Sequence, residues 1–273
     1  MNQESLQSEL AGLGLGSIIY MDSVNSTNLF AADWISRAAP HLSLVVADEQ
    51  TDGRGRAGRK WYTPPAAALA FSLILHAEAL KIEDITKISM FAGLGAVAVC
   101  QAFQNYGLTA KIKWPNDVLF SGQKVAGVLA EMHWTGEKLS ALILGIGINV
   151  ASSAVPPQDW AEHHAHFFPA ISMEKELGQS IDRGKLLRSV LESILDWLPR
   201  WETKDFLEAW RKRLAMRGDW VQIIRPLGDT AHLEGQIIDL NKDGSLAIRL
   251  RSGEQISIRV GDIHLRSVDR SLK

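Results

Sequence analysis

The sequence predicts an α+β protein in which a sheet is covered by helices, followed by a small β-barrel-like module. Two observations predict this class. In the first 217 residues, apolar runs of strand length alternate with segments of helical period, and after Gly218 the chain changes to short strands separated by turns. The expected domains are therefore residues 1–217 and 218–273. With 273 residues, 46% of them hydrophobic, the chain can build one large core and one small one.

A first helix is predicted from Ser26 or Thr27 to about Ala39, because Ser and Thr are preferred at helix N-caps. Its apolar face is expected to consist of Phe30, Trp34 and Ala38. Most Ser and Thr residues in such a position serve only as caps. A helix N-terminus also offers free amide groups to a carboxylate or a ureido oxygen, so a binding role stays open.

Apolar runs predict the buried strands, and the longest periodic segment predicts the main helix. The strand-like runs are 42–47, 67–75, 109–112 and 139–150, the last of them apolar enough to be buried on both faces. The main helix is predicted from Asp84 to about Tyr106, where Gly107 would end it. Gly93 and Gly95 in its middle indicate close packing, which we expect to be against the sheet.

The second half of the chain begins with a long connection. Residues 151–169 are rich in Pro and His, and His163, His164 and His166 lack the Cys or carboxylate partners of a zinc site, so we expect a solvated surface segment. Two helices are predicted at 182–197 and 205–216. The short strands that follow are separated by glycine-containing turns, and they are predicted at 220–225, 232–241, 245–251, 255–260 and 263–266.

Composition narrows the class of protein. Lys and Arg total 29 against 31 Asp and Glu, so the near-neutral charge does not indicate a nucleic-acid-binding protein. Cys100 is the only cysteine, so no intrachain disulfide is possible, and its apolar surroundings predict a small buried hydrophobe. The polar N-terminus lacks a secretory signal and no apolar run reaches transmembrane length. We therefore expect a cytoplasmic protein with no membrane partner.

The most informative segment is the loop from Gly53 to Trp61, here called the arginine loop. It holds four cations and three glycines in the eight residues before the tryptophan. A mobile glycine-rich backbone can present amide N–H groups to a phosphate and fold charge over it. Arg/Gly runs also occur in disordered tails, but this one lies between two predicted strands, which favours a binding site.

A second motif, Lys113-Trp114-Pro115-Asn116-Asp117, follows the predicted strand 109–112. Pro115 cannot continue a sheet ladder, so the motif is predicted to be a turn that places a lysine, an amide and a carboxylate at a strand end. A hairpin brings Lys124 beside this turn, and Gly127 leaves room for a group to lie against the backbone. A lysine at a strand start can simply protect a sheet edge, but two lysines at one turn favour a site.

These segments resemble the signature motifs of the biotin–protein ligases, the biotin–[acetyl-CoA-carboxylase] ligase family. The resemblance runs from about Ser17 to the C-terminus, and the arginine loop together with Lys113–Asp117 is its specific part. The ordered motifs are Ser26-Thr27-Asn28, Gln50 with the arginine loop, Lys113 to Asp117, Lys124-Val125-Ala126-Gly127-Val128-Leu129, and Gly145-Ile146-Gly147-Ile148-Asn149. It implies a class II synthetase-like catalytic domain with a mixed or antiparallel sheet, and an SH3-like C-terminal domain.

The resemblance implies a two-step ligase that uses ATP and Mg²⁺. A carboxylate must be activated before an amine can attack it, so biotin would attack the α-phosphate of ATP, giving biotinyl-5'-AMP and pyrophosphate. A lysine of the biotin carboxyl carrier protein of acetyl-CoA carboxylase, or of a related carboxylase, would then displace AMP. Closure of the arginine loop would keep water from the mixed anhydride.

The resemblance also implies roles for individual residues. Lys124 is the expected catalytic lysine, supported by Lys113, while Arg54 and Arg56 hold phosphate and carboxylate oxygens in fork geometry. Biotin is expected to contact Ser26, Thr27, Asn28, Gln50, Arg54, Gly55, Arg56, Lys124, Gly127, Gly145 and Gly147. ATP is expected to contact Arg56, Arg59, Trp61, Lys113, Asn116, Asp117 and Asn149, with Trp61 stacked on adenine. Asp117 is expected to pair with Mg²⁺ or with a lysine.

Some features depart from the family pattern. Asp52 adds a negative charge beside the arginine loop and is expected to tune its closure, and Ala57 occupies a position that is often basic. About 25 residues precede Ser26, too few for a helix-turn-helix domain, so a monofunctional enzyme that ignores operator DNA is expected. The C-terminal module is expected to help cover the nucleotide. A homodimer is left open.

Two alternative functions remain at this stage. Lipoate–protein ligases share the expected fold and the two-step chemistry but lack this pairing of the arginine loop with Lys113–Asp117. A nucleic-acid-binding module could also combine an Arg/Gly loop with a small β-barrel. The near-neutral charge and the lack of aromatic residues within the basic run count against it.

Overall fold

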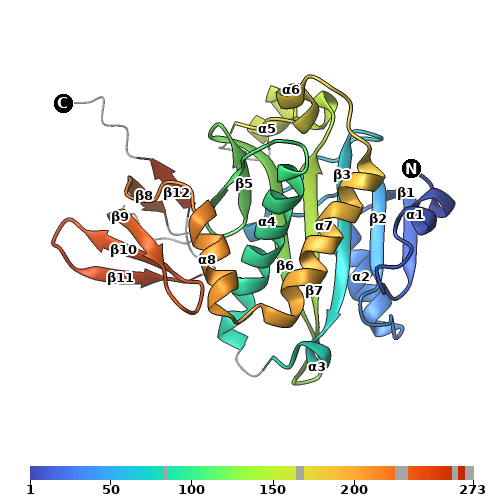
Figure 1. The fold of residues 1–273 in the computed structure, drawn as a ribbon, viewed down its shortest axis with the longest axis horizontal. Coiled ribbons are helices and arrows are strands. Elements are labelled where there is room, and N and C mark those ends of the chain that lie inside the picture. The colour runs from blue at the N-terminus through green and yellow to red at the C-terminus, as the bar shows by residue number, and fades with distance from the viewer. Residues whose placement is uncertain (83–84, 164–168, 225–232, 260–263, 268–273) are drawn as a thin grey trace.

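A computed structural model of the protein describes residues 1–82, 85–163, 169–224, 233–259 and 264–267. Figure 1 shows a larger part built from a sheet and helices, with a smaller β part beside it. The smaller part contains the strands after residue 218, where the sequence predicts a change of texture. The α+β class predicted from the sequence is therefore confirmed.

The larger part is organised around one mixed sheet. Its seven described strands have the order β1-β2-β3-β7-β6-β5-β4. β1 and β2 are parallel, whereas every other neighbouring pair is antiparallel. The strands are β1 (Ile18–Val24), β2 (Leu44–Gln50), β3 (Ala68–His76), β4 (Lys111–Lys113), β5 (Asp117–Phe120), β6 (Gln123–Thr135) and β7 (Lys138–Asn149). All of them except β1 lie where apolar runs or the hairpin predict them.

One face of the sheet is covered by α4 (Ser89–Gln104), α7 (Arg183–Trp197) and α8 (Lys204–Arg213), as Figure 1 shows. α4 is almost completely buried between the sheet and the other two helices. Gly95 packs against Val128 of the sheet, as expected. Gly93 instead faces the ring of Trp210 on α8, because it lies on the opposite side of the helix. Gly107 has a φ of +75°, which suits the predicted end of the helix.

The other face carries α2 (Thr27–Ser36), which packs on β2, β3 and β7. Its buried residues are Thr27, Asn28 and Ala31. The predicted face is confirmed in part: the rings of Phe30 and Trp34 are half-buried and pack against the cluster that contains Ala31, whereas Ala38 lies beyond the helix with a φ of +61°. Apolar periodicity does not show that Thr27 and Asn28 are also buried, because their polar side chains are buried against Ser72. Ser26 occupies the N-cap position, but its side chain makes no cap hydrogen bond.

The remaining helices are short. Among the described helices, only the segment 85–104 is long and apolar enough to cross a membrane, and most of it is buried inside the protein. Asp84, the predicted start of that helix, lies outside the described residues. The short elements are α1 (Gln3–Glu9), η1 (Arg56–Gly58), α3 (Ala77–Leu80), η2 (Ile85–Ile88), η3 (Ser152–Ala154), α5 (Gln158–His163), α6 (Met173–Leu177) and η4 (Leu198–Arg200).

The C-terminal module is an antiparallel sheet with the order β11-β10-β9-β8-β12 among its described residues. The expected short strands are confirmed, but the described pairings link these strands as an open series rather than a closed barrel. The strands are β8 (Trp220–Ile224), β9 (Leu233–Leu240), β10 (Leu246–Leu250), β11 (Gln255–Ile258) and β12 (His264–Ser267).

Candidate functional site

Glycines of β6 and β7 open one face of the sheet beside α2. Successive residues of a strand point to opposite faces, so Leu144 and Ile146 enter the core that contains α4, whereas Gly145 and Gly147 point the other way. Gly127 pairs with Gly147 across the two strands and shares its face. Because these positions have no side chains, other groups can approach the backbone closely.

The arginine loop folds back on itself as an irregular hairpin beyond β2. Isolated bridges pair Gln50 with Thr63 at its base and Arg54 with Lys60 nearer its tip. At the tip, Ala57 adopts a left-handed conformation with a φ of +54°. The ordered pairing shows that the loop is a built element between two strands, as predicted.

Three backbone N–H groups of the loop donate to carbonyl groups within it. Gly55 donates to the carbonyl of Arg59 at 2.7 Å, Arg59 to that of Arg56 at 3.2 Å, and Trp61 to that of Gly53 at 2.8 Å. The expectation that loop amides are presented to a phosphate is therefore wrong for these three in this conformation. Anion binding by the loop has to rely on its side chains.

Asp52 has a structural partner inside the loop. Its carboxylate forms an ion pair with Lys60, on the opposite arm of the hairpin. Both side chains are exposed, so this pair is worth little in stability. It joins the two arms, and an effect on loop closure stays a prediction.

Trp61 covers the glycine-lined face. A Cβ atom at Gly147 would overlap its indole ring, and one at Gly127 would lie 3.2 Å from it. Nζ of Lys124 lies 5.2 Å from the ring centroid, within cation–π range. The indole Nε1 is buried and has no hydrogen-bond partner among the described residues. The indole ring of Trp61 thus fills the space over both glycines. A direct contact of either glycine with biotin stays a prediction.

A buried polar network joins α2 to the strands. Oε1 of Gln50 accepts from the N–H of Thr27 at 2.9 Å and from its hydroxyl at 3.2 Å, while Nε2 of Gln50 donates to Thr63 at 3.0 Å. Oγ of Ser72 lies 2.8 Å from Oγ1 of Thr27 and 2.5 Å from Oδ1 of Asn28. The predicted grouping of Thr27, Asn28 and Gln50 is therefore observed.

Glu131 extends this network to the arginine loop. One carboxylate oxygen accepts from Nδ2 of Asn28 at 2.7 Å, and the other pairs with Nη2 of Arg54 at 3.1 Å. Gly145 makes room for this arrangement, since a Cβ atom there would overlap Oδ1 of Asn28. The glycine is therefore required by the polar network.

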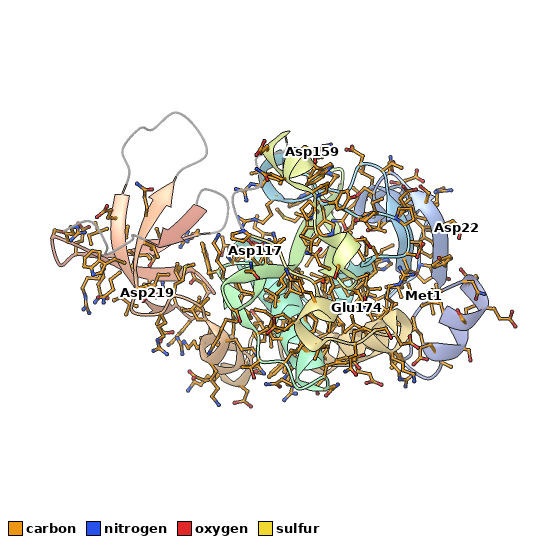
Figure 2. All side chains as sticks on the ribbon, turned by 90° about the horizontal axis from the view of Figure 1, so that it is seen from above. Met1, Asp22, Asp117, Asp159, Glu174 and Asp219 are labelled. Atoms are coloured by element: carbon orange, nitrogen blue, oxygen red, sulfur yellow. The ribbon has the colours of Figure 1, made fainter. Side chains whose placement is uncertain are left out.

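Lys124 and Asp117 form the charged centre of the site. Nζ of Lys124 lies 2.6 Å from Oδ1 of Asp117, and both side chains are mostly buried. Burial alone would raise the pKa of Asp117, but the positive charges of Lys124, Lys113 and Arg56 outweigh it and hold this pKa below its usual value. Asp117 is therefore ionised and holds the Lys124 ammonium in place. Figure 2 shows Asp117 on the side of the larger part that is turned toward the C-terminal module.

Arg56 is oriented by the turn that carries Asp117. Its Nη1 donates to Oδ1 of Asn116 at 3.0 Å, and Nδ2 of Asn116 donates to the carbonyl of Val128 at 2.7 Å. Burial lowers the pKa of Arg56, and the Asp117 carboxylate opposes this shift. A guanidinium nevertheless remains charged at neutral pH.

The other residues predicted to bind nucleotide are more dispersed. Lys113 pairs with Asp117 in the β4–β5 ladder, and its charge contributes to the cluster. Asn149 is buried at the end of β7, where Nδ2 donates to the carbonyl of Ile171 at 3.2 Å. This bond gives Asn149 a structural role, and contacts of Asn149 and Arg59 with a nucleotide stay predictions.

The described residues do not form a resident metal site. No group of three or more His, Cys, Asp or Glu side chains among them is arranged to hold an ion. Asp117 is engaged by Lys124, which is the second of the two partners expected for it. A contact of Asp117 with Mg²⁺ stays a prediction. His164, His166 and the side chain of His163 lie outside the described residues.

Sequence reasoning missed three polar residues of the site, namely Thr63, Ser72 and Glu131. Ser72 is fully buried and is the only polar residue of the run Ala67–Leu75, a signal that could have identified it. Glu131 follows the motif Lys124–Leu129 on β6 and lies on the same face of the strand as Gly127, which also could have been read from strand alternation. Thr63 carries no comparable signal.

Comparison with known proteins places these features in a family. A family model described as the biotin/lipoate A/B protein ligase family matches residues 20–149. A biotin–[acetyl-CoA-carboxylase] ligase of Paracoccus denitrificans is 32% identical over 245 residues, which are 86% of this chain and 94% of that protein. The chain belongs to the biotin/lipoate A/B protein ligase family. The matched segment of this ligase-family protein contains every predicted site residue from Ser26 to Asn149.

Other relatives differ in length. A bifunctional ligase/repressor BirA of Bacillus subtilis is 35% identical over 187 residues, which are 68% of this chain but only 54% of that protein, so this ligase-family chain spans about half of its relative. The solved structure of an Aquifex aeolicus biotin protein ligase in complex with biotin and ATP has 29% sequence identity and a TM-score of 0.75. That alignment covers 92% of this chain and 99% of the other.

Proposed function

We propose that the protein is an ATP-dependent biotin–protein ligase, which activates biotin as biotinyl-5'-AMP and transfers it to a lysine of a biotin carboxyl carrier protein. One observation carries the proposal: the cationic cluster of Arg56 and Lys124 lies on the same glycine-lined face as the polar network of Thr27 and Gln50. The cationic cluster suits a phosphate and a carboxylate, and the polar network suits a ureido group. The Aquifex aeolicus relative in complex with biotin and ATP supports the same pair of ligands.

The charges suit the first step of this reaction. The biotin carboxylate and the α-phosphate of ATP repel each other as the bond forms, and a positioned cation lowers that barrier. Lys124 supplies a compact charge that Asp117 holds in place, and Arg56 supplies a guanidinium fork that Asn116 orients. Both cations are therefore oriented before substrates arrive, which favours the transition state.

The second step requires the carrier lysine to reach the acyl carbon. β6 extends beyond β5, and from Leu129 to Thr135 it pairs only with β7 in the part of the chain that the structure describes. A carrier strand added at this edge would lie beside Glu131 and the arginine loop. The same edge is a candidate contact for a homodimer, which sedimentation analysis with and without carrier would detect.

A direct assay tests the proposed function. The protein is incubated with biotin, ATP, Mg²⁺ and a biotin carboxyl carrier domain, and the carrier is analysed by intact mass. We expect one biotinyl adduct with biotin and none when lipoate replaces it. A lipoyl adduct without a biotinyl adduct would assign the protein to lipoate transfer instead.

Arg56→Gly is expected to weaken retention of biotinyl-5'-AMP. The substitution removes the guanidinium that joins the arginine loop to Asn116, so closure of the loop becomes less favourable. We expect faster release of the adenylate and less selective labelling of free amines, measured by stopped-flow dissociation and by biotinylation of a bystander protein. Arg56→Lys keeps the positive charge but lacks the guanidinium fork. Its rate of adenylate release should lie between the rates of the parent protein and of Arg56→Gly. An unchanged adenylate dissociation rate in Arg56→Gly would show that the loop is not its lid.

We further propose that the protein acts in the cytoplasm. Its single cysteine, Cys100, is buried in α4, and burial raises the pKa of the thiol to about 12. The thiol is therefore protonated and inert, which fits a reducing compartment. Cell fractionation with the carrier protein as a marker would test the location.

A further inference from the structure

The C-terminal module contacts the larger part at the motif that carries Asn116 and Asp117. The indole Nε1 of Trp114 donates to the carbonyl of Gly244 at 2.9 Å, and this hydrogen bond is buried. Gly244 belongs to the turn Asn241–Ser245, which joins β9 to β10. This hydrogen bond therefore joins the C-terminal module to Trp114, which lies two residues before Asn116 in the chain.

The turn Asn241–Ser245 is closed by backbone hydrogen bonds and fits a tight space. Asn241 donates to the carbonyl of Ser245 at 2.8 Å, and Gly244 donates to that of Asn241 at 3.0 Å. Gly244 has a φ of +76°, which favours glycine, and a Cβ atom there would lie 2.7 Å from Sδ of Met90 and 3.1 Å from Cζ3 of Trp210. The turn is therefore wedged between α4 and α8.

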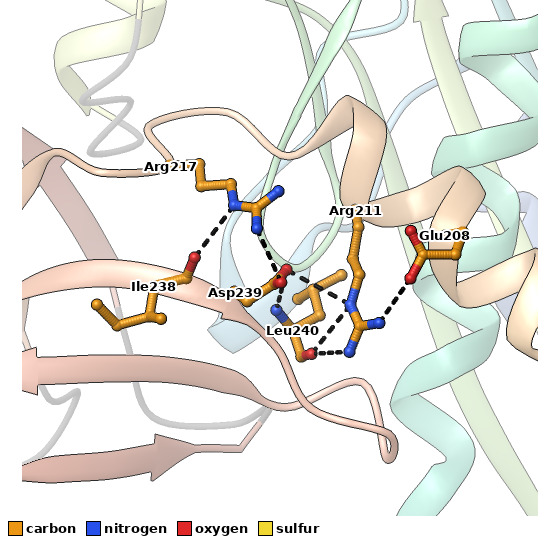
Figure 3. A network of polar contacts seen from close by, with 6 residues as sticks. All are labelled: Glu208, Arg211, Arg217, Ile238, Asp239 and Leu240. Carbon is orange, nitrogen blue, oxygen red and sulfur yellow. Dashed lines mark hydrogen bonds and ion pairs between the residues drawn. The ribbon is translucent and has the colours of Figure 1, made fainter.

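The strand before the turn is anchored to the segment around α8, as Figure 3 shows. Arg211 of α8 donates to the carbonyl of Leu240 from Nη2 at 2.6 Å and from Nε at 3.2 Å. Arg217 pairs with Asp239 at 3.0 Å, and Arg211 also pairs with Glu208 at 2.7 Å. These bonds limit how far the turn can shift along α8.

The contact continues into the site through the chain itself. Trp114 is followed by Pro115, Asn116 and Asp117, so a shift of the indole moves the turn that orients Arg56 and Lys124. The carbonyl of Asn116 also accepts from the N–H of Val128 at 3.0 Å. The module is therefore connected to the cationic cluster by the buried Trp114–Gly244 hydrogen bond and by the three peptide links from Trp114 to Asp117.

We propose that the turn Asn241–Ser245 is a positioning element of the adenylation site, in which Gly244 fixes Trp114 and thereby Asn116 and Asp117. The consequence for catalysis rests on the proposed function. Removal of the whole module is a poor test, because it would uncover Met90, Trp114 and Trp210 and so destabilise the core. Single substitutions in the full chain separate positioning from folding.

Two variants break the contact from its two sides. Trp114→Phe keeps an aromatic ring but removes the Nε1 donor, and Gly244→Ala forces the turn or Met90 to move. Displacement of a catalytic group by about 1 Å can cost on the order of 100-fold, so we expect kcat for biotinyl-5'-AMP formation to fall by about tenfold in each variant. KM for biotin should change little, because Thr27 and Gln50 lie outside this path.

Gly253→Ala is the matched control. Gly253 has a φ of +90° in the turn that joins β10 to β11, and its N–H donates to Leu250 at 3.0 Å, the same distance as for Gly244. A Cβ atom there meets nothing within 4 Å. Gly253→Ala therefore introduces the same backbone strain as Gly244→Ala but no clash with Met90 or Trp210. Its kcat should equal that of the parent protein. The double variant Trp114→Phe/Gly244→Ala should lose no more than the more impaired single variant, because both act on one bond.

Amide hydrogen exchange gives a readout that does not need ligase activity. Exchange at the N–H of Val128 should quicken in Trp114→Phe and Gly244→Ala and stay unchanged in Gly253→Ala. Unchanged kcat in folded Trp114→Phe, or an equal loss in Gly253→Ala, would overturn the positioning role. If the parent protein does not adenylate biotin, the proposed function fails, and unchanged exchange at Val128 in both variants would then overturn this inference as well.

Discussion

Lys124→Ala is expected to slow formation of biotinyl-5'-AMP by about 10³-fold, because removing one preorganised electrostatic partner of a transition state costs on the order of 10²–10³ and this one also carries a full charge. Nζ of Lys124 lies 2.6 Å from Oδ1 of Asp117 and over the ring of Trp61, and the substitution removes its charge from this position. The rate of pyrophosphate release at saturating biotin and ATP measures the loss.

Folding and specificity controls accompany this variant. Asp117 keeps the positive charges of Lys113 and Arg56 nearby, so the fold should survive, as circular dichroism would show. Lys138→Ala removes an exposed lysine at the start of β7, away from the site, and should release pyrophosphate at the parent rate. Parent-like release by folded Lys124→Ala would transfer the catalytic role to Lys113.

The sequence predicts most elements of this fold because their signals are local. The hairpin of β5 and β6 follows from the turn at Ser121 and Gly122, which both have positive φ, and β7 follows from an apolar run that is buried as expected. The short strands of the C-terminal module follow from alternation and glycine turns. Each of these signals operates within about ten residues, the range over which propensity and turn chemistry decide structure.

The misses have a common cause, which is contact between distant segments. α1 and β1 are not predicted, and the two are joined by a side chain: the amide of Gln3 donates to the carbonyl of Ile18 and accepts from the N–H of Tyr20. The residues around Gln3 carry no sequence signal that its side chain will hydrogen-bond to an edge strand. The polar part of the buried face of α2 is missed for the same reason, since Thr27 and Asn28 are buried by partners on β2, β3 and β6.

In the site too, features with a local sequence signal are predicted and features that depend on distant contacts are missed. The arginine loop and the turn at Lys113–Asp117 are predicted because their composition is unusual in itself. The pairing of Lys124 with Asp117 is among the expected alternatives, since both lie at one hairpin. The position of Trp61 over Gly127 and Gly147 depends on the register between β6 and β7, and periodicity does not supply register.

Gly145→Ala is expected to raise the Kd for biotin on the order of 100-fold, comparable to the cost of a misplaced binding group. The new Cβ atom would overlap Oδ1 of Asn28, whose amide is held between Ser72 and Glu131. The Asn28 side chain would have to break its hydrogen bonds to Ser72 and Glu131. The hydrogen bond between Ser72 and the Thr27 hydroxyl would be disturbed as a result. Overpacking of this kind lowers the free energy of unfolding by about 1–3 kcal/mol. Isothermal titration with biotin, together with thermal unfolding, measures both effects.

A double variant decides whether the clash is the cause. Asn28→Ala removes the side chain that the new methyl group would strike, so Asn28→Ala/Gly145→Ala should bind biotin no worse than Asn28→Ala alone. The two substitutions would then be strongly non-additive, with the glycine needed only when asparagine is present. If their losses add instead, biotin itself lies against the backbone of β7 at this position, and the family's glycine is kept for the ligand rather than for Asn28.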